Sequence, residues 1–214
     1  MITDPYICNA ETIERAIREV GIIPFFKSDI PGYSIKELTL PEFWFDGEED
    51  TLGPWDWKID CLESGDIAYG KYLCGNKAAF ATMPFYRELM NLRRATTQPD
   101  KDGQKIMEYL AQRGSITIKE VRALLGVKKG AADAAIAKLQ HQCRVVTGVI
   151  ERVYRGPEQT YNGWQVSYFC TSESLFEDAL QTNHTPEESQ EFLTDHIAKL
   201  FPEATHKQLL KVLR

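Results

Sequence analysis

Aromatic and cationic side chains gather in the first half of the chain at a spacing that suits nucleotide chemistry. Three of the 4 tryptophans stand between positions 44 and 57, and a lysine directly follows the last of them. Indole rings stack on bases, and ammonium or guanidinium groups bind phosphate, so this group could hold a base with its phosphate. Burial in a core is the other explanation of clustered tryptophans, and it stays open. The predicted pocket consists of Trp44, Trp55, Trp57, Lys58, Arg93 and Arg94.

Carboxylates accompany these tryptophans at helical spacing. Asp56, Asp60 and Glu63 follow one another at i, i+4 and i+7, which places them on one face of a helix. Two carboxylates held together could act as general acid and general base. A solvated helix face has the same pattern, so no catalytic residue is predicted from it.

The cysteines and histidines lack the spacing of a metal or redox site. No C-x-x-C pair occurs, and no two histidines lie three or four residues apart. Zinc sites need such pairs, whereas an odd number of widely spaced cysteines is typical of reduced cytosolic proteins. We therefore expect free thiols, no metal ion, no cofactor and a cytoplasmic location. The cysteines are Cys8, Cys61, Cys74, Cys143 and Cys170, and the histidines are His141, His184, His196 and His206.

Composition and charge narrow the class of protein. With 214 residues, of which 43% are hydrophobic and 26% charged, the chain can bury a core in one or two domains. No apolar run approaches the ~20 residues of a membrane helix, and the start does not resemble a secretory signal, so no membrane partner is expected. The formal charge is −8 over residues 1–83, +7 over 84–156 and −5 over 157–214. A basic middle indicates a bound polyanion, and scatter in surface charge is the alternative.

The basic middle predicts a winged helix-turn-helix. Apolar residues recur at helical spacing in three short stretches, near 104–113, 118–125 and 130–142. The pattern then becomes that of strands over 144–154 and 164–170, with turn residues between them, as in a β-hairpin. Three helices followed by a hairpin is the element order of a winged helix, which places its third helix in the major groove when it reads DNA.

The third helix of this region has a face of small residues, which leaves two interpretations open. Gly130, Ala134 and Ala137 lie opposite its apolar stripe. This face lacks the arginine or asparagine that reads bases, so it either lies against DNA by shape, with lysines on phosphates, or packs on another domain or partner. The predicted nucleic-acid-binding residues are Lys128, Lys129, Lys138, His141, Arg152 and Arg155.

The segments on either side of the basic middle also have helix and turn signals. Helices are expected over 11–20, near 54–64 and over 84–94, with a hairpin around Gly75 between the last two. The sequence TPEE at 185–188 combines a capping threonine, a proline at the first helical position and glutamates in the first turn. A pair of amphipathic helices is expected to follow.

These elements predict an α+β fold in three parts. Residues 1–97 form an aromatic-rich α+β unit, and the polar stretch 95–103 is a candidate linker. Residues 98–174 form the winged helix-turn-helix domain. Residues 175–214 form helices that pack on the rest of the chain or on a second subunit, so a homodimer is a candidate assembly.

Several sequence blocks resemble the bacterial proteins called AlkZ-related. The resemblance extends over nearly the whole chain. The blocks are IPFFKSDIPG at 23–32, GPWDWK at 53–58, DIAYGK at 66–71, NLRR at 91–94 and TPEES at 185–189. The group is named for its similarity to AlkZ, a winged-helix DNA glycosylase that removes alkylated or crosslinked bases. The resemblance therefore implies a winged-helix protein that acts on damaged DNA.

One motif of the AlkZ enzymes is not matched here. Those enzymes position the attacking water with a Gln-aliphatic-Gln or Gln-aliphatic-Asp motif. The one Gln-x-Gln of this chain, Gln140-His141-Gln142, has a histidine at its centre and lies at the end of the third helix. The catalytic role is therefore not carried over to these residues.

The favoured hypothesis from the sequence is a winged-helix DNA-binding protein linked to the handling of damaged DNA. One alternative is a glycosylase-like hydrolase of alkylated bases, for which the tryptophan group would hold an extruded base. The other is a winged-helix protein-interaction module. Whether the protein is an enzyme is left open by the sequence.

Overall fold

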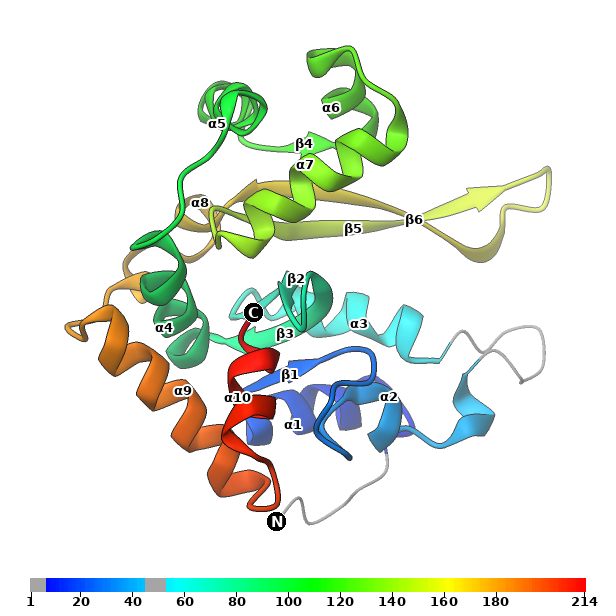
Figure 1. Ribbon diagram of the computed structural model, residues 1–214. Coiled ribbons are helices and arrows are strands. Elements are labelled where there is room, and N and C mark those ends of the chain that lie inside the picture. The colour runs from blue at the N-terminus through cyan, green and yellow to red at the C-terminus, as the bar shows by residue number, and fades with distance from the viewer. Residues whose placement is uncertain (1–6, 45–52) are drawn as a thin grey trace.

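The computed structural model describes residues 7–44 and 53–214, apart from the side chain of Asp178, and has an α+β fold (Figure 1). Ten α-helices and two antiparallel three-stranded sheets occur within these ranges. The sheets lie in different halves of the molecule, one above the other in Figure 1, with helices around each. The α+β class predicted from the sequence is confirmed.

The lower half in Figure 1 is built from the first part of the chain. Its elements are α1 (Ala10–Val20), β1 (Ile22–Pro24), α2 (Ile35–Leu38), the 3-10 turn η1 (Pro41–Phe43), α3 (Pro54–Glu63), β2 (Ile67–Leu73), β3 (Lys77–Thr82) and α4 (Met83–Arg94). The strand order is β1-β3-β2. Gly21 ends α1 at a φ of 78°, and a Cβ there would lie 2.1 Å from the ring of Phe85, so this position requires glycine.

The upper half is built from the middle of the chain. Its elements are α5 (Lys101–Arg113), β4 (Ile116–Thr117), α6 (Ile118–Leu125), α7 (Lys129–His141), β5 (Val145–Arg155) and β6 (Thr160–Thr171). The strand order is β4-β6-β5, and the long β5–β6 hairpin extends beyond the helices (Figure 1). Thr117 forms a capping box with Glu120 at the start of α6.

The first helix of the upper half begins earlier than the sequence pattern predicts. Its expected start was residue 104, whereas α5 begins at Lys101. Asp100 caps the helix, because its carboxylate accepts a hydrogen bond of 2.9 Å from the backbone N–H of Gly103. The last four residues of the predicted linker 95–103 therefore cap or belong to α5. The chain between α4 and α5 is short.

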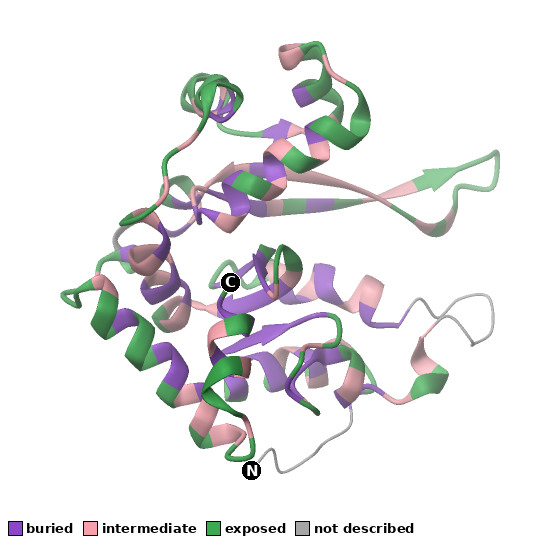
Figure 2. Cartoon of the chain, viewed as in Figure 1, coloured by how far each residue is buried: buried purple, intermediate pink, exposed green. Residues whose placement is uncertain are grey.

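Each half has its own hydrophobic core, and the last helices complete the lower one. After β6 come α8 (Ser172–Phe176), the 3-10 turn η2 (Glu177–Leu180), α9 (Pro186–Leu200) and α10 (His206–Val212). Leu193 and Ile197 of α9 and Leu209 of α10 are buried in the lower core (Figure 2). The upper core contains Ile106, Leu110, Ile116, Val121, Ala132, Ile136, Leu139, Val145 and Phe169. Within the described ranges, no helix has both the length and the apolar character needed to cross a membrane.

A buried arginine joins the two halves. Arg93, at the end of α4, is 6% exposed. Its guanidinium donates hydrogen bonds to three backbone carbonyls: those of Tyr72 and His141, both at 3.0 Å, and that of Leu213. It also contacts the imidazole of His141. Because these partners come from β2, α7 and the end of the chain, one side chain fixes three segments that are distant in sequence.

A buried glutamate fixes α9 to α4. Glu88 is 1% exposed, and its carboxylate accepts hydrogen bonds from Thr182 at 2.8 Å and Ser189 at 2.6 Å. His184 Nδ1 lies 3.0 Å from the same carboxylate. Burial alone would raise the pKa of Glu88, but the hydrogen bonds from Ser189, Thr182 and His184 outweigh it and hold the pKa below its usual value.

We predict that Glu88→Gln lowers the free energy of unfolding by about 1–3 kcal/mol at pH 7. The amide NH2 of glutamine would face hydrogen-bond donors that bind a carboxylate oxygen in the wild type. The folded-state pKa is lowered, so this stabilisation is complete above the ordinary pKa of 4.5 and is lost as the pH falls through the folded-state value. Urea unfolding at pH 7 and at acidic pH measures both effects. The exposed Glu187 of α9 is the control position, and equal unfolding midpoints for Glu88→Gln and Glu187→Gln would contradict the prediction.

Candidate functional site

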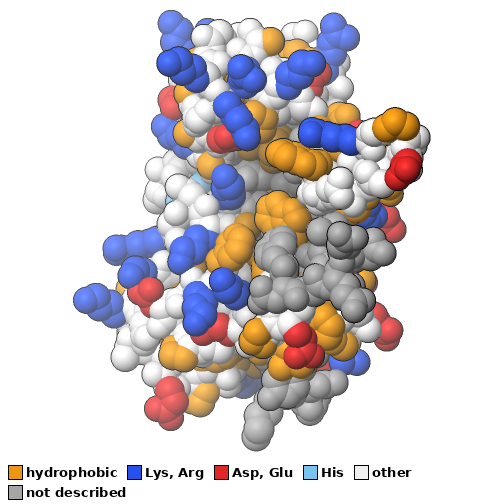
Figure 3. All heavy atoms as spheres, turned by 90° about the vertical axis from the view of Figure 1, so that its right-hand side faces the viewer, with side chains coloured by type: hydrophobic (Ala, Val, Ile, Leu, Met, Phe, Trp, Pro, Cys, Tyr) orange, Lys and Arg blue, Asp and Glu red, His pale blue; other side chains and the backbone are white. Residues whose placement is uncertain are grey.

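A cleft lies between the β5–β6 hairpin, α7 and the lower half of the molecule, and we call it the hairpin cleft. Its inner pocket has a volume of about 200 Å³ and is lined among others by Lys58 and Gln140. Its outer groove has a volume of about 950 Å³ and is lined by Lys119, Arg122 and Lys129 among others. The two are continuous, because Trp55, Ile118, Asp133, Gln165, Ser167 and Phe169 line both. Figure 3 shows the hollow beside the hairpin, with lysine and arginine side chains gathered on the upper half above it.

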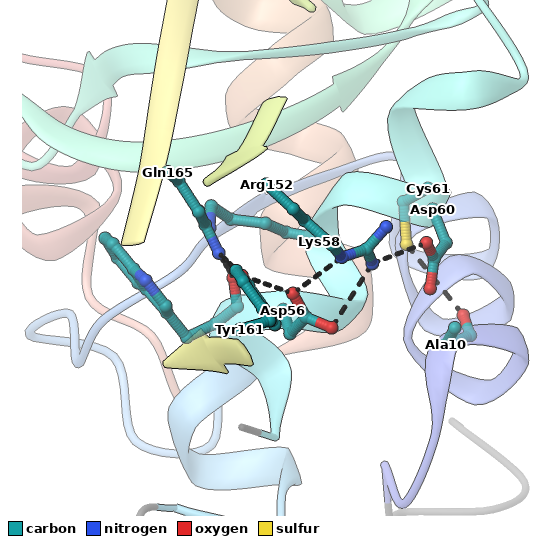
Figure 4. Close-up of polar contacts among 9 residues, drawn as sticks. Ala10, Asp56, Lys58, Asp60, Cys61, Arg152, Tyr161 and Gln165 are labelled. Carbon is teal, nitrogen blue, oxygen red and sulfur yellow. Dashed lines mark hydrogen bonds and ion pairs between the residues drawn. The ribbon is translucent and has the colours of Figure 1, made fainter. Parts of the chain in front are cut away.

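A polar cluster fixes the hairpin over α3 (Figure 4). Arg152 of β5 donates to Asp56 at 3.0 and 3.2 Å and to Asp60 at 2.9 Å. The hydroxyl of Tyr161 on β6 donates to Asp56 at 2.7 Å. The hydrogen bonds with Asp56 and then Asp60 raise the pKa of Arg152 above its ordinary value, against the opposing effect of burial. Of the three carboxylates predicted on one helix face, Asp56 and Asp60 therefore bind the hairpin and have no acid–base arrangement of their own.

Lys58 lies beneath the hairpin in the inner pocket. It is 2% exposed, and its Nζ donates to the carbonyl of Trp55 and to Oε1 of Gln165. The Nζ also lies 3.9 Å from the centroid of the Trp55 ring. No ion pair involves Lys58 within the described part of the chain. Burial lowers the pKa of Lys58 to about 7, with an opposing effect from Asp56 and a further lowering by Arg152.

Two glutamines shape the walls of the inner pocket. Gln165 donates to Tyr161 at 2.9 Å and to the Trp55 carbonyl at 3.3 Å. Gln140 donates to Thr147 at 3.0 Å and accepts from the backbone N–H of Lys71 at 3.2 Å. The latter contact needs a glycine at position 70, where a Cβ would lie 3.0 Å from the Gln140 amide nitrogen.

The carboxylate of Asp133 completes the pocket wall. It is half-buried on α7 and lines both the inner pocket and the outer groove. Within the described ranges, no hydrogen bond or ion pair engages this side chain. Its negative charge is therefore available to a molecule in the hairpin cleft.

The structure separates most of the predicted pocket residues. Only Trp55 and Lys58 of that set line the hairpin cleft. The ring of Trp44 contacts Phe25, with centroids 5.6 Å apart, and the ring of Trp57 contacts Phe43 at the same separation. All three tryptophans are partly buried against the lower core, as in the alternative interpretation.

The two predicted pocket arginines are engaged inside the protein. Arg93 is buried at the junction of the two halves, as described above. Arg94 forms an ion pair with Glu173 and donates to the carbonyl of Cys143 at 2.7 Å. Neither guanidinium lines the hairpin cleft, so in this arrangement neither is placed to bind phosphate there.

Three of the six predicted nucleic-acid-binding residues are also engaged by other side chains. Lys138 pairs with Asp100 at 2.7 Å, and Arg152 belongs to the hairpin cluster. His141 is half-buried against Arg93; burial and then the guanidinium charge lower its pKa to about 4, so the ring is neutral at pH 7. These residues position the hairpin, α5 and the junction.

The other three predicted residues are exposed. Lys128 and Lys129 stand at the start of α7 without an ion pair in the described part of the chain. Arg155, near the tip of the hairpin, lies 4.6 Å from the ring of Trp164, which is itself 57% exposed. Cations therefore occur at the start of α7 and at the hairpin, on either side of the outer groove.

Sequence reasoning missed several residues of the cleft. Lys119 and Arg122 are exposed on α6 and line the outer groove, and their i, i+3 spacing on the polar side of that helix is the signal that could have found them. Gln165 had no such signal, because its partner Lys58 is 107 residues away. Of the Gln140-His141-Gln142 motif, Gln140 lines the inner pocket, whereas Gln142 donates to the carbonyl of Gln98 at 3.0 Å.

The comparisons with known proteins give one family. A family model described as AlkZ related matches residues 7–214. The chain therefore belongs to the AlkZ-related family, which confirms the resemblance seen in its sequence blocks and supports an association with DNA repair. No curated protein and no solved structure gives a significant match.

We predict that Lys58 makes the stability of the protein depend on pH. The unfolded chain keeps the ordinary lysine pKa of 10.5, whereas the folded-state pKa is about 7. Between these values the unfolded state binds more protons, so the free energy of unfolding rises with pH, by about 2 kcal/mol between pH 7 and 9. Lys58→Met removes this contribution. The measurement is the change in unfolding free energy between pH 7 and 9 in wild type, minus the same change in the variant. Lys71→Met, at an exposed lysine on the same pocket, keeps it; a parallel pH profile for wild type and Lys58→Met would refute the prediction.

Proposed function

We propose that this protein is a winged-helix DNA-binding protein that acts in DNA repair, with its DNA-binding surface formed by α6, the start of α7 and the hairpin. Family membership supports the association with repair. The element order α5-β4-α6-α7-β5-β6 and the strand order β4-β6-β5 support a winged helix, in which α7 is the third helix and the β5–β6 hairpin is the wing. A second core formed by Ile106, Leu139, Phe169 and their neighbours supports residues 98–174 as a domain, while Cys143, Val146 and Ile150 of this range pack into the lower core.

The observation that carries the proposal is a set of unpaired cations along the outer groove. Lys119, Arg122, Lys128 and Lys129 are exposed, and none has an ion pair among the described residues. Their charges lie together with the positive end of the α7 helix dipole, a combination that attracts phosphate. A groove of about 950 Å³ beside them has room for a nucleic-acid backbone.

The environment of α7 restricts how it would contact DNA. Its second half packs against β2, and Gln140 bonds to the backbone there. Its first half is exposed, with Gly130 and Ala134 on the surface. The small residues allow close approach but offer no base-reading group, so we infer binding through phosphates and duplex shape.

The glycosylase alternative has less support from the predicted motif. The amides of Gln140 and Gln142 are both buried and both hydrogen-bonded to other parts of the chain. Gln142 lines neither part of the hairpin cleft, and both amide atoms of Gln140, which lines the inner pocket, are engaged by Thr147 and by the backbone N–H of Lys71. Binding therefore ranks above base excision by these two residues.

We predict that Lys128→Glu/Lys129→Glu weakens binding to a labelled duplex at least about tenfold and lowers the slope of log affinity against log salt by about 2, because two phosphate contacts are lost. Fluorescence anisotropy over a range of salt concentrations measures both quantities. The matched control is Lys199→Glu/Lys207→Glu, which makes the same change in net charge at exposed lysines of α9 and α10.

Two results would overturn the proposed function. One is an absence of binding by the wild-type protein to duplex DNA at low salt. The other is an equal loss of affinity in the two double variants, since that would indicate a response to net charge rather than to a defined surface.

A further inference from the structure

Lys58 is a buried lysine without a counter-ion. Transfer of an ammonium group out of water costs several kcal/mol unless a carboxylate accompanies it. The nearby carboxylates of Asp56 and Asp60 are bound to Arg152 instead. Lysines held in this way lose their proton readily and are used as nucleophiles toward carbonyl groups.

The contacts of Nζ suit a neutral amine. A neutral amine has two N–H groups and one lone pair, and Nζ has two acceptors, the Trp55 carbonyl and Oε1 of Gln165. No group donates a hydrogen bond to Nζ within the described ranges. Both acceptors and the Trp55 ring therefore hold the amine at the wall of the inner pocket while its lone pair stays unshared.

The connection between the inner pocket and the outer groove identifies the chemical class of the carbonyl compound. The inner volume of about 200 Å³ has room for one sugar or one base, and the groove outside it is lined by Lys119, Arg122 and Lys129. A ligand that fits both has a small carbonyl-bearing unit attached to a polyanion. The ring-opened deoxyribose of an abasic site in DNA has this composition, since its C1′ is an aldehyde and the sugar is joined to a phosphate on each side.

We propose that Lys58 is a catalytic residue that forms a Schiff base with the C1′ aldehyde of an abasic site bound in the hairpin cleft. This activity rests on the proposed DNA binding. It is distinct from base excision and does not use Gln140 or Gln142.

The reaction begins with attack of the neutral Nζ on C1′, which forms the N–C1′ bond and opens the C=O π bond. The carbinolamine takes up one proton from solvent and loses water to give an iminium ion. Asp133, on the same pocket, then removes a proton from C2′, the C–H electrons form the C2′=C3′ double bond, and the C3′–O bond breaks. The downstream strand leaves with a 5′-phosphate. One water then hydrolyses the iminium ion, which releases an unsaturated aldehyde and the neutral amine of Lys58, and the protons from Asp133 and from this hydrolysis return to solvent. Water consumed equals water released, and no oxidant is required.

The test is reductive trapping on a duplex with one abasic site. Sodium borohydride converts the iminium ion to a stable amine, so wild type is expected to give a covalent protein–DNA complex on a denaturing gel. Lys58→Arg keeps a cation but has no nucleophilic amine, and it is expected to reduce trapping at least about tenfold. Lys105→Arg, at an exposed lysine of α5 that lines neither part of the hairpin cleft, is expected to trap like wild type. Asp133→Asn is expected to keep the adduct and slow strand cleavage at least about tenfold.

Two measurements separate this inference from the proposed function. Binding of each variant to an intact duplex is measured by anisotropy, and peptide mass mapping of the trapped wild-type complex locates the modified lysine even if Lys58→Arg does not fold. Intact DNA binding without an adduct, or an adduct on another lysine, overturns the role of Lys58 and leaves the proposed function standing. An absence of DNA binding overturns both.

Discussion

The position of the hairpin depends on one cation, Arg152, which is shared between Asp56 and Asp60. Isolated surface ion pairs contribute little to the stability of the folded state, because water screens the charges and the side chains lose conformational entropy. This contact is stronger in kind, since the guanidinium is bidentate on Asp56, bonds Asp60 as well, and is only 25% exposed. The two strands of the hairpin contain 23 residues, and among the described residues no other ion pair joins them to α3. The roof of the inner pocket, and with it the burial of Lys58, follows from this contact.

The same contact creates the electrostatic problem at Lys58. Asp56 would be the natural counter-ion of a lysine two positions away, but Arg152 and Tyr161 occupy its oxygens. The cation at Arg152 then disfavours a second positive charge nearby. The cluster therefore stabilises the hairpin and destabilises the ammonium form of Lys58 together. An apolar side chain of similar volume at position 58 would stabilise the fold more than a buried lysine does. The presence of Lys58 therefore favours a functional role for its amine.

Local patterns in the sequence predict the elements well and the site poorly, for a physical reason. The cap at Thr117, the helix start at Thr185 and the hairpin depend on residues a few positions apart, so periodicity and capping rules identify them. The structure does not bring the tryptophans of the predicted stacking platform together, because Trp55 and Trp57 lie about 200° apart around α3. Lys58 meets Gln165, and Arg93 meets Leu213, across 107 and 120 residues. Contacts of this kind depend on the packing of complete units, which no local pattern encodes.

The charge distribution of the folded chain determines where a polyanion can approach. The first 83 residues carry a net charge of −8, which would repel DNA from the whole lower half if it were uniformly exposed. Arg152 and Tyr161 cover the acidic face of α3, and Arg18 bonds Asp66 at 2.8 and 2.9 Å on another side. The cations of α6 and the start of α7 have no such partners in the described part of the chain, so the positive potential concentrates at the mouth of the hairpin cleft. An approaching backbone is thereby directed to the groove that opens onto Lys58 and Asp133, and the acidic lower half limits how far it can extend beyond that point.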